Sequence, residues 1–252
     1  MVFLLFLLGV CIGSFLNVVI FRVPEGLPVW RGRSHCLNCQ TPIRPLDLIP
    51  VVSFFLLRGR CRGCHQTISW QYPVVELSLG LLFVLVAVFS PDGLVSIPLL
   101  VRNLIFVTSL TLIFVYDLRY LAIIDRFTIP AMVIAVILNL WFGLVSPVSM
   151  LLGALVLGGF FYGQFALSRG TWVGGGDIRL GALMGFMLGL TQGLVALFIA
   201  YVAGAIFGLG LLALKKANRK TPIPFGTFLS IATVVMLLLG DAPLHWYLSF
   251  FV

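Results

Sequence analysis

Charged side chains are scarce in this sequence. Of its 252 residues only 10% are charged and only eight are acidic, whereas a soluble globular protein carries about 25% charged residues. The hydrophobic share is 61%, and apolar runs of about twenty residues, the length of a membrane-spanning helix, recur along the chain. These features exclude a soluble enzyme or binding domain. The sequence predicts an all-α polytopic membrane protein.

Two further absences exclude other classes of protein. No basic residue precedes the first apolar run, and that run is too long for the apolar part of a cleaved signal peptide. We therefore expect it to be retained as a membrane helix. The chain also has no internal repeat at a fixed period, whereas many transporters are built from inverted repeats. A transporter with intramembrane acids as ion sites is consequently a weak alternative.

We expect about eight transmembrane helices, with a small cytoplasmic zinc-binding loop between the first and the second. The apolar segments cover residues 2–21, 73–89, 98–116, 127–145, 148–167, 179–191, 193–214 and 225–243. The sixth and seventh segments nearly merge around residues 191–193. The chain then divides into a first transmembrane helix (1–21), a polar loop (22–72) and a transmembrane core (73–252).

The basic residues indicate how the chain is oriented in the membrane. With eight spans, fifteen of the sixteen Lys and Arg residues fall on one side, and Arg102 is the exception. The last loop on that side holds Lys215, Lys216, Arg219 and Lys220. By the positive-inside rule this side is cytoplasmic, and both termini lie outside. The net charge of +8 is thus explained by topology, and no nucleic-acid partner is expected.

The polar loop contains four of the five cysteines, arranged as two Cys-x-x-Cys pairs separated by 21 residues. They are Cys36, Cys39, Cys61 and Cys64. Each pair offers two sulfurs from one tight turn, and two turns complete the tetrahedron of a structural four-thiolate zinc site. Arg33, Arg60 and Arg62 lie near the cysteines in sequence and are expected to favour the thiolate forms. A metal would also replace the core that this loop lacks.

Redox-active dithiols or unrelated free thiols are the alternatives for these cysteines. A thioredoxin-type Cys-x-x-Cys belongs in a βαβ context, which the loop lacks. A reducing cytoplasm disfavours structural disulfides. Zinc is the better interpretation.

Two acids that are distant in sequence reach the same membrane face. On the eight-span topology, Asp117 ends the third helix and Asp177 begins the sixth, both on the cytoplasmic side. Ionisable groups at such depth are costly and point to function. Two neighbouring carboxylates that share a proton are the chemistry of an aspartic protease. The alternative is that both acids form interfacial ion pairs, Asp117 with Arg119 or Arg126 and Asp177 with Arg179.

The glycines before Asp177 favour the functional interpretation. Each of Gly174, Gly175 and Gly176 costs a helix roughly 1 kcal/mol relative to alanine. Such a run is explained where a second backbone or a substrate strand must come close. A phosphate-binding loop is disfavoured because no Lys-Ser/Thr pair follows. Glu76, in "QYPVVE", is expected to be an acid at the start of the second span.

Five stretches, taken in order, resemble the type IV prepilin leader peptidases, which are bacterial membrane aspartic peptidases of the GxGD class. They are "GSFLNVVIFRVP" (13–24), "ISWQYPVVE" (68–76) after the paired cysteines, "YDLRYLAIIDRFTIP" (116–130), "GGGDIRLGALMGFMLG" (174–189) and "IPFGTFLS" (223–230). The resemblance implies that Asp117 and Asp177 are the catalytic aspartates and that Asp125 is a helix-start residue. Ile124 stands where the family commonly has proline, and Arg179 stands where lysine is usual.

The resemblance also implies an activity. The family cleaves the short basic leader from prepilins and pseudopilins of type IV pili, type II secretion and competence systems. The cut falls at the cytoplasmic face of the inner membrane. Many members then methylate the new N-terminus with S-adenosylmethionine. The expected partners are therefore these substrates and membrane lipid. Two alternatives stay open: a GxGD protease of other membrane proteins, and a non-enzymatic assembly factor that docks through its zinc loop.

Overall fold

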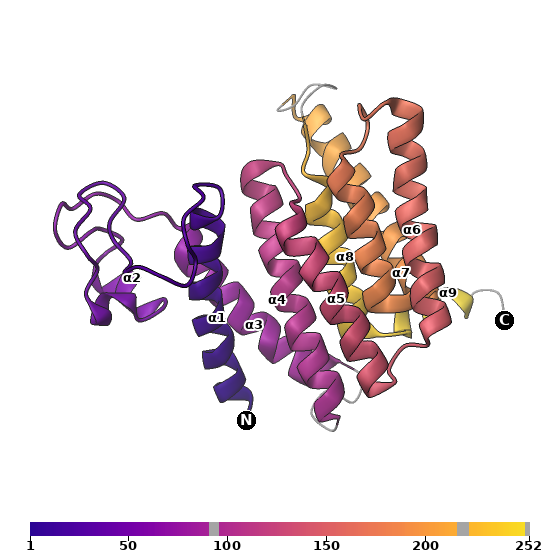
Figure 1. The fold of residues 1–252 in the computed structure, drawn as a ribbon, viewed down its shortest axis with the longest axis horizontal. Coiled ribbons are helices and arrows are strands. Elements are labelled where there is room, and N and C mark those ends of the chain that lie inside the picture. The colour runs from indigo at the N-terminus through magenta and orange to yellow at the C-terminus, as the bar shows by residue number, and fades with distance from the viewer. Residues whose placement is uncertain (91–95, 216–221, 250–252) are drawn as a thin grey trace. The chain divides into compact units, whose positions relative to one another are not determined.

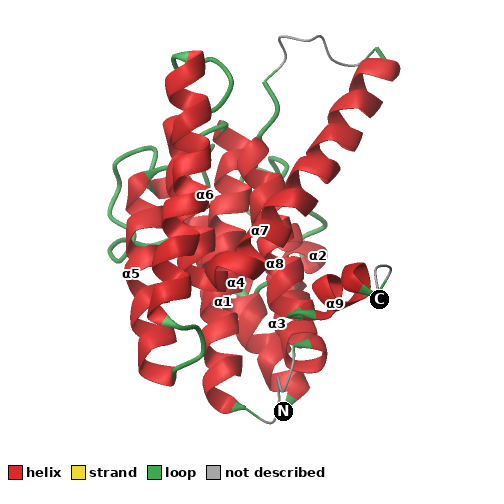
Figure 2. Ribbon diagram, turned by 90° about the vertical axis from the view of Figure 1, so that its right-hand side faces the viewer, coloured by secondary structure: helices red, strands yellow, loops and turns green. Residues whose placement is uncertain are grey.

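The computed structural model describes residues 1–90, 96–215 and 222–249, and these residues are helical apart from loops and turns (Figures 1 and 2). Lys216, Arg219 and Lys220, which entered the charge count, lie outside this part. The chain divides into two compact units, Met1–Leu85 and Val86–Val252. The helices are α1 (Val2–Arg22), η1 (Pro45–Leu48), α2 (Val52–Leu56), α3 (Gln71–Phe89), α4 (Ile97–Tyr120), α5 (Asp125–Phe142), α6 (Pro147–Ser168), α7 (Gly175–Ala213), α8 (Phe225–Leu239) and α9 (Ala242–Leu248).

The long apolar helices make this a multi-pass membrane protein. In the described part of the chain, six helices are long and apolar enough to cross a bilayer, namely α1, α3, α4, α5, α6 and α7. The predicted sixth and seventh spans both fall within α7, which has 39 residues. The predicted eighth span corresponds to α8, which is apolar but has only 15 residues. The count of eight spans therefore stays a prediction.

A break at Gly189 divides α7 into two segments. Gly189 has φ 77° and ψ −170°, a conformation that a residue with a side chain rarely adopts. Before the break, Gly185 faces Ala154 of α6. After it, Tyr201 and Gln164 exchange hydrogen bonds of 2.8 and 3.1 Å. The chain thus runs along α6 in one direction, turns at Gly189 and returns beside it. The sequence placed this boundary a few residues later, at 191–193.

Side chains from neighbouring helices bind the backbone groups that this break exposes. The Asn139 amide of α5 donates to the carbonyl oxygens of Phe186 (2.8 Å) and Met187 (3.3 Å). The Ser149 hydroxyl of α6 accepts from the Leu190 N–H at 3.0 Å. Inside a bilayer no water can replace these partners, so a broken membrane helix depends on them.

Arg102, the exception to the charge asymmetry, is a buried residue of α4. It is 8% exposed, and its guanidinium donates to the side-chain oxygens of Asn139 (3.2 Å) and Asn103 (3.0 and 2.9 Å). Arg102 thereby orients the amide that binds the α7 carbonyls. Arg102 therefore serves the packing of the helix bundle, which explains why it does not share the side of the membrane on which the other basic residues are expected.

Glycines let α6 and α7 approach until their backbones touch. A Cβ atom on Gly153 would lie 2.8 Å from the backbone of Gly189, and one on Gly185 would collide with the backbone of Gly153 and Ala154. Small residues at helix interfaces give membrane helices close packing, which is a main attraction available to them in lipid. Side chains at these positions would force the helices apart.

The first unit is built on an equally close contact between α1 and α3. A Cβ atom on Gly13 would lie 2.8 Å from the Cα of Glu76. Asn17, fully buried, donates to the Tyr72 carbonyl oxygen at 3.2 Å. Glu76 is not in the first turn of α3, as the sequence suggested, but one turn and a half inside it and 5% exposed. It therefore contributes to packing in this unit rather than to the start of the helix.

Gly185→Ala should destabilise the α6–α7 contact. The added methyl group meets backbone atoms, which cannot move aside as a side chain can, so we expect a loss of about 1–3 kcal/mol. Gly159→Ala is the matched control on α6, because a Cβ there has no heavy atom within 4 Å. Thermal unfolding in detergent measures both. Equal midpoints for the two variants would contradict the described packing.

Candidate active site and metal centre

Asp117 lies near the end of α4, three residues before Tyr120. Its side chain is buried, with 4% of the residue exposed. The Tyr116 ring packs at 4.7 Å from Tyr120 and at 5.1 Å from Phe127, at the start of α5. After α4, Leu121 takes a left-handed conformation and donates to the Asp117 carbonyl oxygen at 2.8 Å. These contacts fix the end of the helix and hence the position of the carboxylate.

The Asp117 carboxylate lies at the N-terminus of α8. Its Oδ2 accepts from the Thr227 N–H at 3.1 Å. A Cβ atom on Gly226 would lie only 2.8 Å from the same oxygen, so glycine is required there. The first turn of a helix offers free N–H donors and a partial positive charge, and both favour an anion. This contact explains how a carboxylate is accommodated at membrane depth.

Asp177 is the third residue of α7 and is 8% exposed. Its Oδ2 accepts from the Gly174 N–H at 3.0 Å, and its own N–H donates to the Gly174 carbonyl oxygen at 3.1 Å. The carboxylate therefore caps its own helix, as the acid of a capping box does. Both aspartates are consequently held at positive helix ends.

The two aspartates both adjoin residues that pack on Ile123, in the loop between α4 and α5. A Cβ atom on Gly176, next to Asp177, would lie 2.6 Å from the Ile123 Cβ. One on Gly226, which touches the Asp117 carboxylate, would lie 2.7 Å from the Ile123 Cδ1. The fold thus brings together two acids that lie 60 residues apart in the chain (117 and 177).

The three glycines before Asp177 have different surroundings. Gly176 packs on Ile123, so its lack of a side chain serves the fold. Gly175 has no heavy atom within 4 Å of a Cβ position, and at Gly174 the nearest atom is the Asp177 Oδ2 at 3.6 Å. The sequence suggested that all three glycines leave space for a substrate backbone. The structure has such space beside Gly174 and Gly175, but not beside Gly176.

The surface ion-pair alternative does not describe these aspartates. Two ion pairs occur among the described residues, Asp47–Arg62 (2.7 Å) and Asp125–Arg179 (2.6 Å), and neither involves Asp117 or Asp177. Arg179 therefore binds the acid that starts α5. Asp125 is the first residue of that helix, as expected. Because both partners are about half exposed, this pair contributes little stability.

Sequence reasoning missed several residues around the aspartates. Gly226 and Thr227 were part of a quoted motif but were given no role, although "PFGT" resembles a helix start. Tyr201, which is hydrogen-bonded to Gln164, interacts electrostatically with Asp177. A tyrosine in an apolar helix carries no signal in the sequence that would distinguish it from other packing residues.

In the tetracysteine loop, the four predicted ligands lie close together. Their sulfur atoms all fall within 4.8 Å of one another, with Cys36–Cys64 at 3.8 Å and Cys39–Cys61 at 4.0 Å. Four thiolates around one zinc ion, each at about 2.3 Å, would be separated by about 3.8 Å. The geometry fits such an ion. The four cysteines can therefore bind a metal such as zinc.

Each Cys-x-x-Cys pair forms the same tight turn. The Gln40 N–H donates to the Cys36 carbonyl oxygen (2.9 Å), and the His65 N–H donates to that of Cys61 (3.0 Å). Gln40 and His65, each directly after the second cysteine of its pair, have positive φ angles of 56° and 57°. The two turns present their sulfurs to a common centre, as a structural metal site requires.

Hydrogen bonds, rather than the neighbouring arginines, favour the thiolate forms of Cys39 and Cys61. The Thr41 hydroxyl lies 3.2 Å from the Cys39 sulfur, and its hydrogen bond is the main cause that lowers the pKa of Cys39 to about 6. The N–H groups of Cys64 and Gly63 lower the pKa of Cys61. Arg62, expected to act on the thiols, instead makes a two-pronged contact with Asp47 at 2.9 and 2.7 Å and lowers the pKa of that carboxyl.

Fold and site together define a helical membrane protein with a pair of buried carboxylates and a tetracysteine loop. Two family models match the chain: the bacterial peptidase A24 N-terminal domain over residues 7–90, which include all four clustered cysteines, and the type IV leader peptidase family over residues 104–209, which include both aspartates. The chain belongs to the type IV leader peptidase family.

Similar proteins cover nearly the whole chain. The prepilin leader peptidase/N-methyltransferase of Aeromonas salmonicida (strain A449) is 36% identical, over 98% of this chain and 93% of its own length. The proteins of the same name from Bacillus subtilis (strain 168) and Neisseria gonorrhoeae are 30% and 31% identical, over 99% and 96% of this chain and 98% and 93% of their own lengths. No solved structure matches the chain significantly.

Thr41→Val should make metal binding more sensitive to acid. Without the hydroxyl, the pKa of Cys39 rises from about 6 toward its usual value, so protons compete with the metal at higher pH. The pH at which half of the metal is lost should therefore move upward, while Thr41→Ser, which keeps the hydroxyl, should not shift it. Metal content measured against pH tests this. Superimposable retention curves for Thr41→Val and the native chain would refute the assignment.

Proposed function

We propose that Asp117 and Asp177 are the catalytic pair of an aspartic endopeptidase that removes the leader peptide from prepilins and pseudopilins. The observation that carries the proposal is that two buried aspartates both adjoin glycines that pack on Ile123, with Asp117 held by the N-terminus of α8. Neither carboxylate is neutralised by a basic side chain in an ion pair among the described residues. Two acids so placed can share one proton.

A shared proton gives the pair both roles that peptide hydrolysis needs. The ionised carboxylate removes a proton from water, and the water oxygen attacks the scissile carbonyl carbon. The protonated partner donates its proton to the carbonyl oxygen. Collapse of the tetrahedral intermediate breaks the C–N bond, and the amine leaves with a proton from the pair. Two coupled acids titrate together, so the roles belong to the pair rather than to one residue.

The proposed orientation places this pair at the cytoplasmic face of the inner membrane, with both termini outside. The support is the distribution of charge, since fifteen of sixteen basic residues fall on the side that carries Asp117, Asp177 and the cysteine loop. The family's substrates present a basic leader in the cytoplasm and an apolar helix in the membrane. A cut between the two requires carboxylates at this depth.

The metal of the loop is proposed to be zinc, bound by Cys36, Cys39, Cys61 and Cys64. Four thiolates leave no open coordination position, so its role is structural. It would join two turns 21 residues apart in a segment that has little core of its own. No step of the hydrolysis passes through it.

A second activity is proposed because the relatives are named N-methyltransferases as well as peptidases. The methyl group of S-adenosylmethionine would be transferred from its sulfonium to the new N-terminal amine. The amine loses one proton, and S-adenosylhomocysteine leaves. The amine that this step needs is the product of the peptidase reaction, so cleavage must come first.

Replacing either aspartate should abolish cleavage. Asp117→Asn and Asp177→Asn each remove one acid of the pair, so we expect the rate of leader removal to fall by at least about a hundredfold. Asp125→Asn is the matched control, because its carboxylate lies in the same region but pairs with Arg179. The assay is mass measurement of the mature N-terminus after incubation of a prepilin with purified protein and S-adenosylmethionine.

The same spectrum separates the two activities. A product lacking the leader and heavier by one methyl group supports both, whereas a product without the methyl group supports the peptidase alone. Normal processing by Asp117→Asn or Asp177→Asn would exclude the two-aspartate mechanism.

A further inference from the structure

The segment that contains η1 and α2 carries large apolar side chains that are more than half exposed. Leu46 is 75% exposed, Phe55 56% and Leu56 76%. Trp70, which directly precedes α3, is 64% exposed. Trp30 and Leu37 are also exposed in this loop, but around η1 and α2 the exposed apolar side chains are neighbours, which is unfavourable in water. Such a surface requires an apolar or interfacial environment.

The start of α2 is tied to a point well inside the membrane helices of its unit. The Val51 N–H donates to the Glu76 carboxylate at 2.7 Å. Glu76 is five residues after Gln71, the first residue of α3, which corresponds to about 7.5 Å along the helix. Its backbone packs on Gly13 of α1, nine residues before that helix ends at Arg22. The loop therefore folds back beside these helices and does not simply project beyond their ends.

Val51 is the residue at which the chain turns before α2. It has φ 62°, a conformation that a β-branched residue adopts only when its surroundings demand it. The hydrogen bond to Glu76 stabilises this conformation. The turn leads directly into α2, so the start of this helix is fastened to Glu76 of α3.

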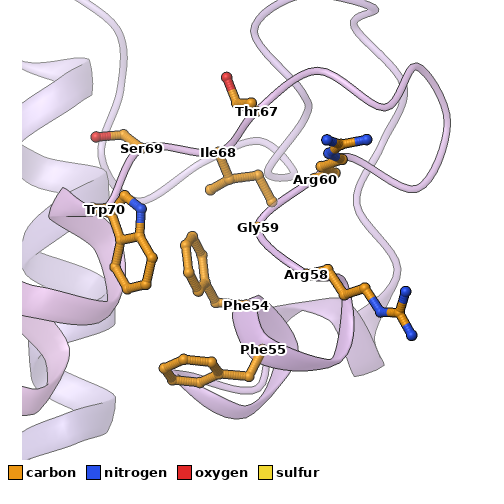
Figure 3. A pocket seen from close by; sticks show the side chains of 9 residues that line it. All are labelled: Phe54, Phe55, Arg58, Gly59, Arg60, Thr67, Ile68, Ser69 and Trp70. Atoms are coloured by element: carbon orange, nitrogen blue, oxygen red, sulfur yellow. The ribbon is translucent and has the colours of Figure 1, made fainter.

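An open pocket of about 880 Å³ lies between α2 and the strand-like segment before α3 (Figure 3). Phe54, Phe55 and Trp70 form its wall toward the helices, and Arg58 and Arg60 lie on the other side. The Trp70 ring lies 4.8 Å from that of Phe54. Thr67 and Ser69 add hydroxyl groups. Aromatic rings beside arginines are the composition found where a protein meets a membrane interface.

We propose that η1 and α2 lie in the headgroup region of the bilayer and that the arginines beside this pocket contact the phosphates of anionic phospholipids. The exposed apolar side chains would enter the upper acyl region, as those of an interfacial helix do. Arg58 and Arg60, whose side chains extend away from the aromatic wall (Figure 3), would bind phosphates of the surrounding lipid through their planar donors. Lipid is favoured over a protein partner because α1 and α3, to which the segment is tied, are themselves membrane spans. The anchor is independent of the peptidase reaction.

Tryptophan fluorescence can locate this segment in a bilayer. The five native tryptophans are replaced by phenylalanine, and one new tryptophan is introduced as Leu56→Trp. Leu37→Trp is the matched control, because Leu37 is 61% exposed and lies in the first cysteine turn. The full chain is reconstituted in vesicles of phosphatidylcholine and phosphatidylglycerol, and zinc content confirms that the loop is folded. Quenching by lipids with a nitroxide on the headgroup is compared with quenching by acrylamide in water.

We expect the tryptophan at position 56 to be quenched by the labelled lipid and protected from acrylamide, and the one at position 37 to show the reverse. Equal acrylamide quenching at both positions would refute the anchor. Protection of position 56 without lipid quenching would also refute it, since this would indicate a protein partner or a second copy of the chain.

The contact between the arginines and lipid phosphates has its own test. In the Leu56→Trp protein, quenching by labelled lipid should be stronger in vesicles that contain phosphatidylglycerol than in phosphatidylcholine alone. The double change Arg58→Gln and Arg60→Gln should remove this difference while leaving the zinc content unchanged. A difference that persists without the two arginines would overturn their assignment as phosphate ligands.

Discussion

A bilayer contains no water to satisfy a polar group, and this constraint governs the structure of the second unit. Where α7 breaks at Gly189, the exposed carbonyl groups are bound by Asn139, which Arg102 holds in place. Where the Asp117 carboxylate enters the bundle, the N-terminus of α8 supplies its donor. At both of these places a neighbouring helix provides the partner that water cannot. The candidate active site uses the same solution as the break in the helix.

Neighbouring helices can supply these hydrogen-bond partners because their backbones lie close together. Glycine residues at the contacts make this close packing possible. Gly226 allows α8 to reach the Asp117 carboxylate, and Gly176 allows the start of α7 to settle on Ile123. A methyl group at either position would move an aspartate away from the other. The glycines of the candidate site are therefore part of how two acids from distant helices are brought together, and not only space for a substrate.

In the first unit the constraint is size. A loop of about fifty residues between two membrane helices is too small to fold stably on an apolar core of its own. Four thiolates that converge on one centre provide one solution. The Glu76 carboxylate, which binds the Val51 N–H, provides another by fastening the loop to α3. In the aromatic cluster, Phe54 is buried whereas Phe55 and Trp70 are more than half exposed. Lipid in contact with the two exposed rings would explain this arrangement.

The sequence by itself determined the class, the tetracysteine ligands and the two aspartates as candidates. Apolar run length, Cys-x-x-Cys spacing and the rarity of acids are properties of residue type and position, and partition into lipid or metal binding depends directly on them. Only the tertiary structure decided that Ile123 and Gly226 join the aspartates, that Arg179 pairs with Asp125, and that Glu76 lies buried under the loop. These depend on contacts between residues far apart in the chain, which no local pattern encodes.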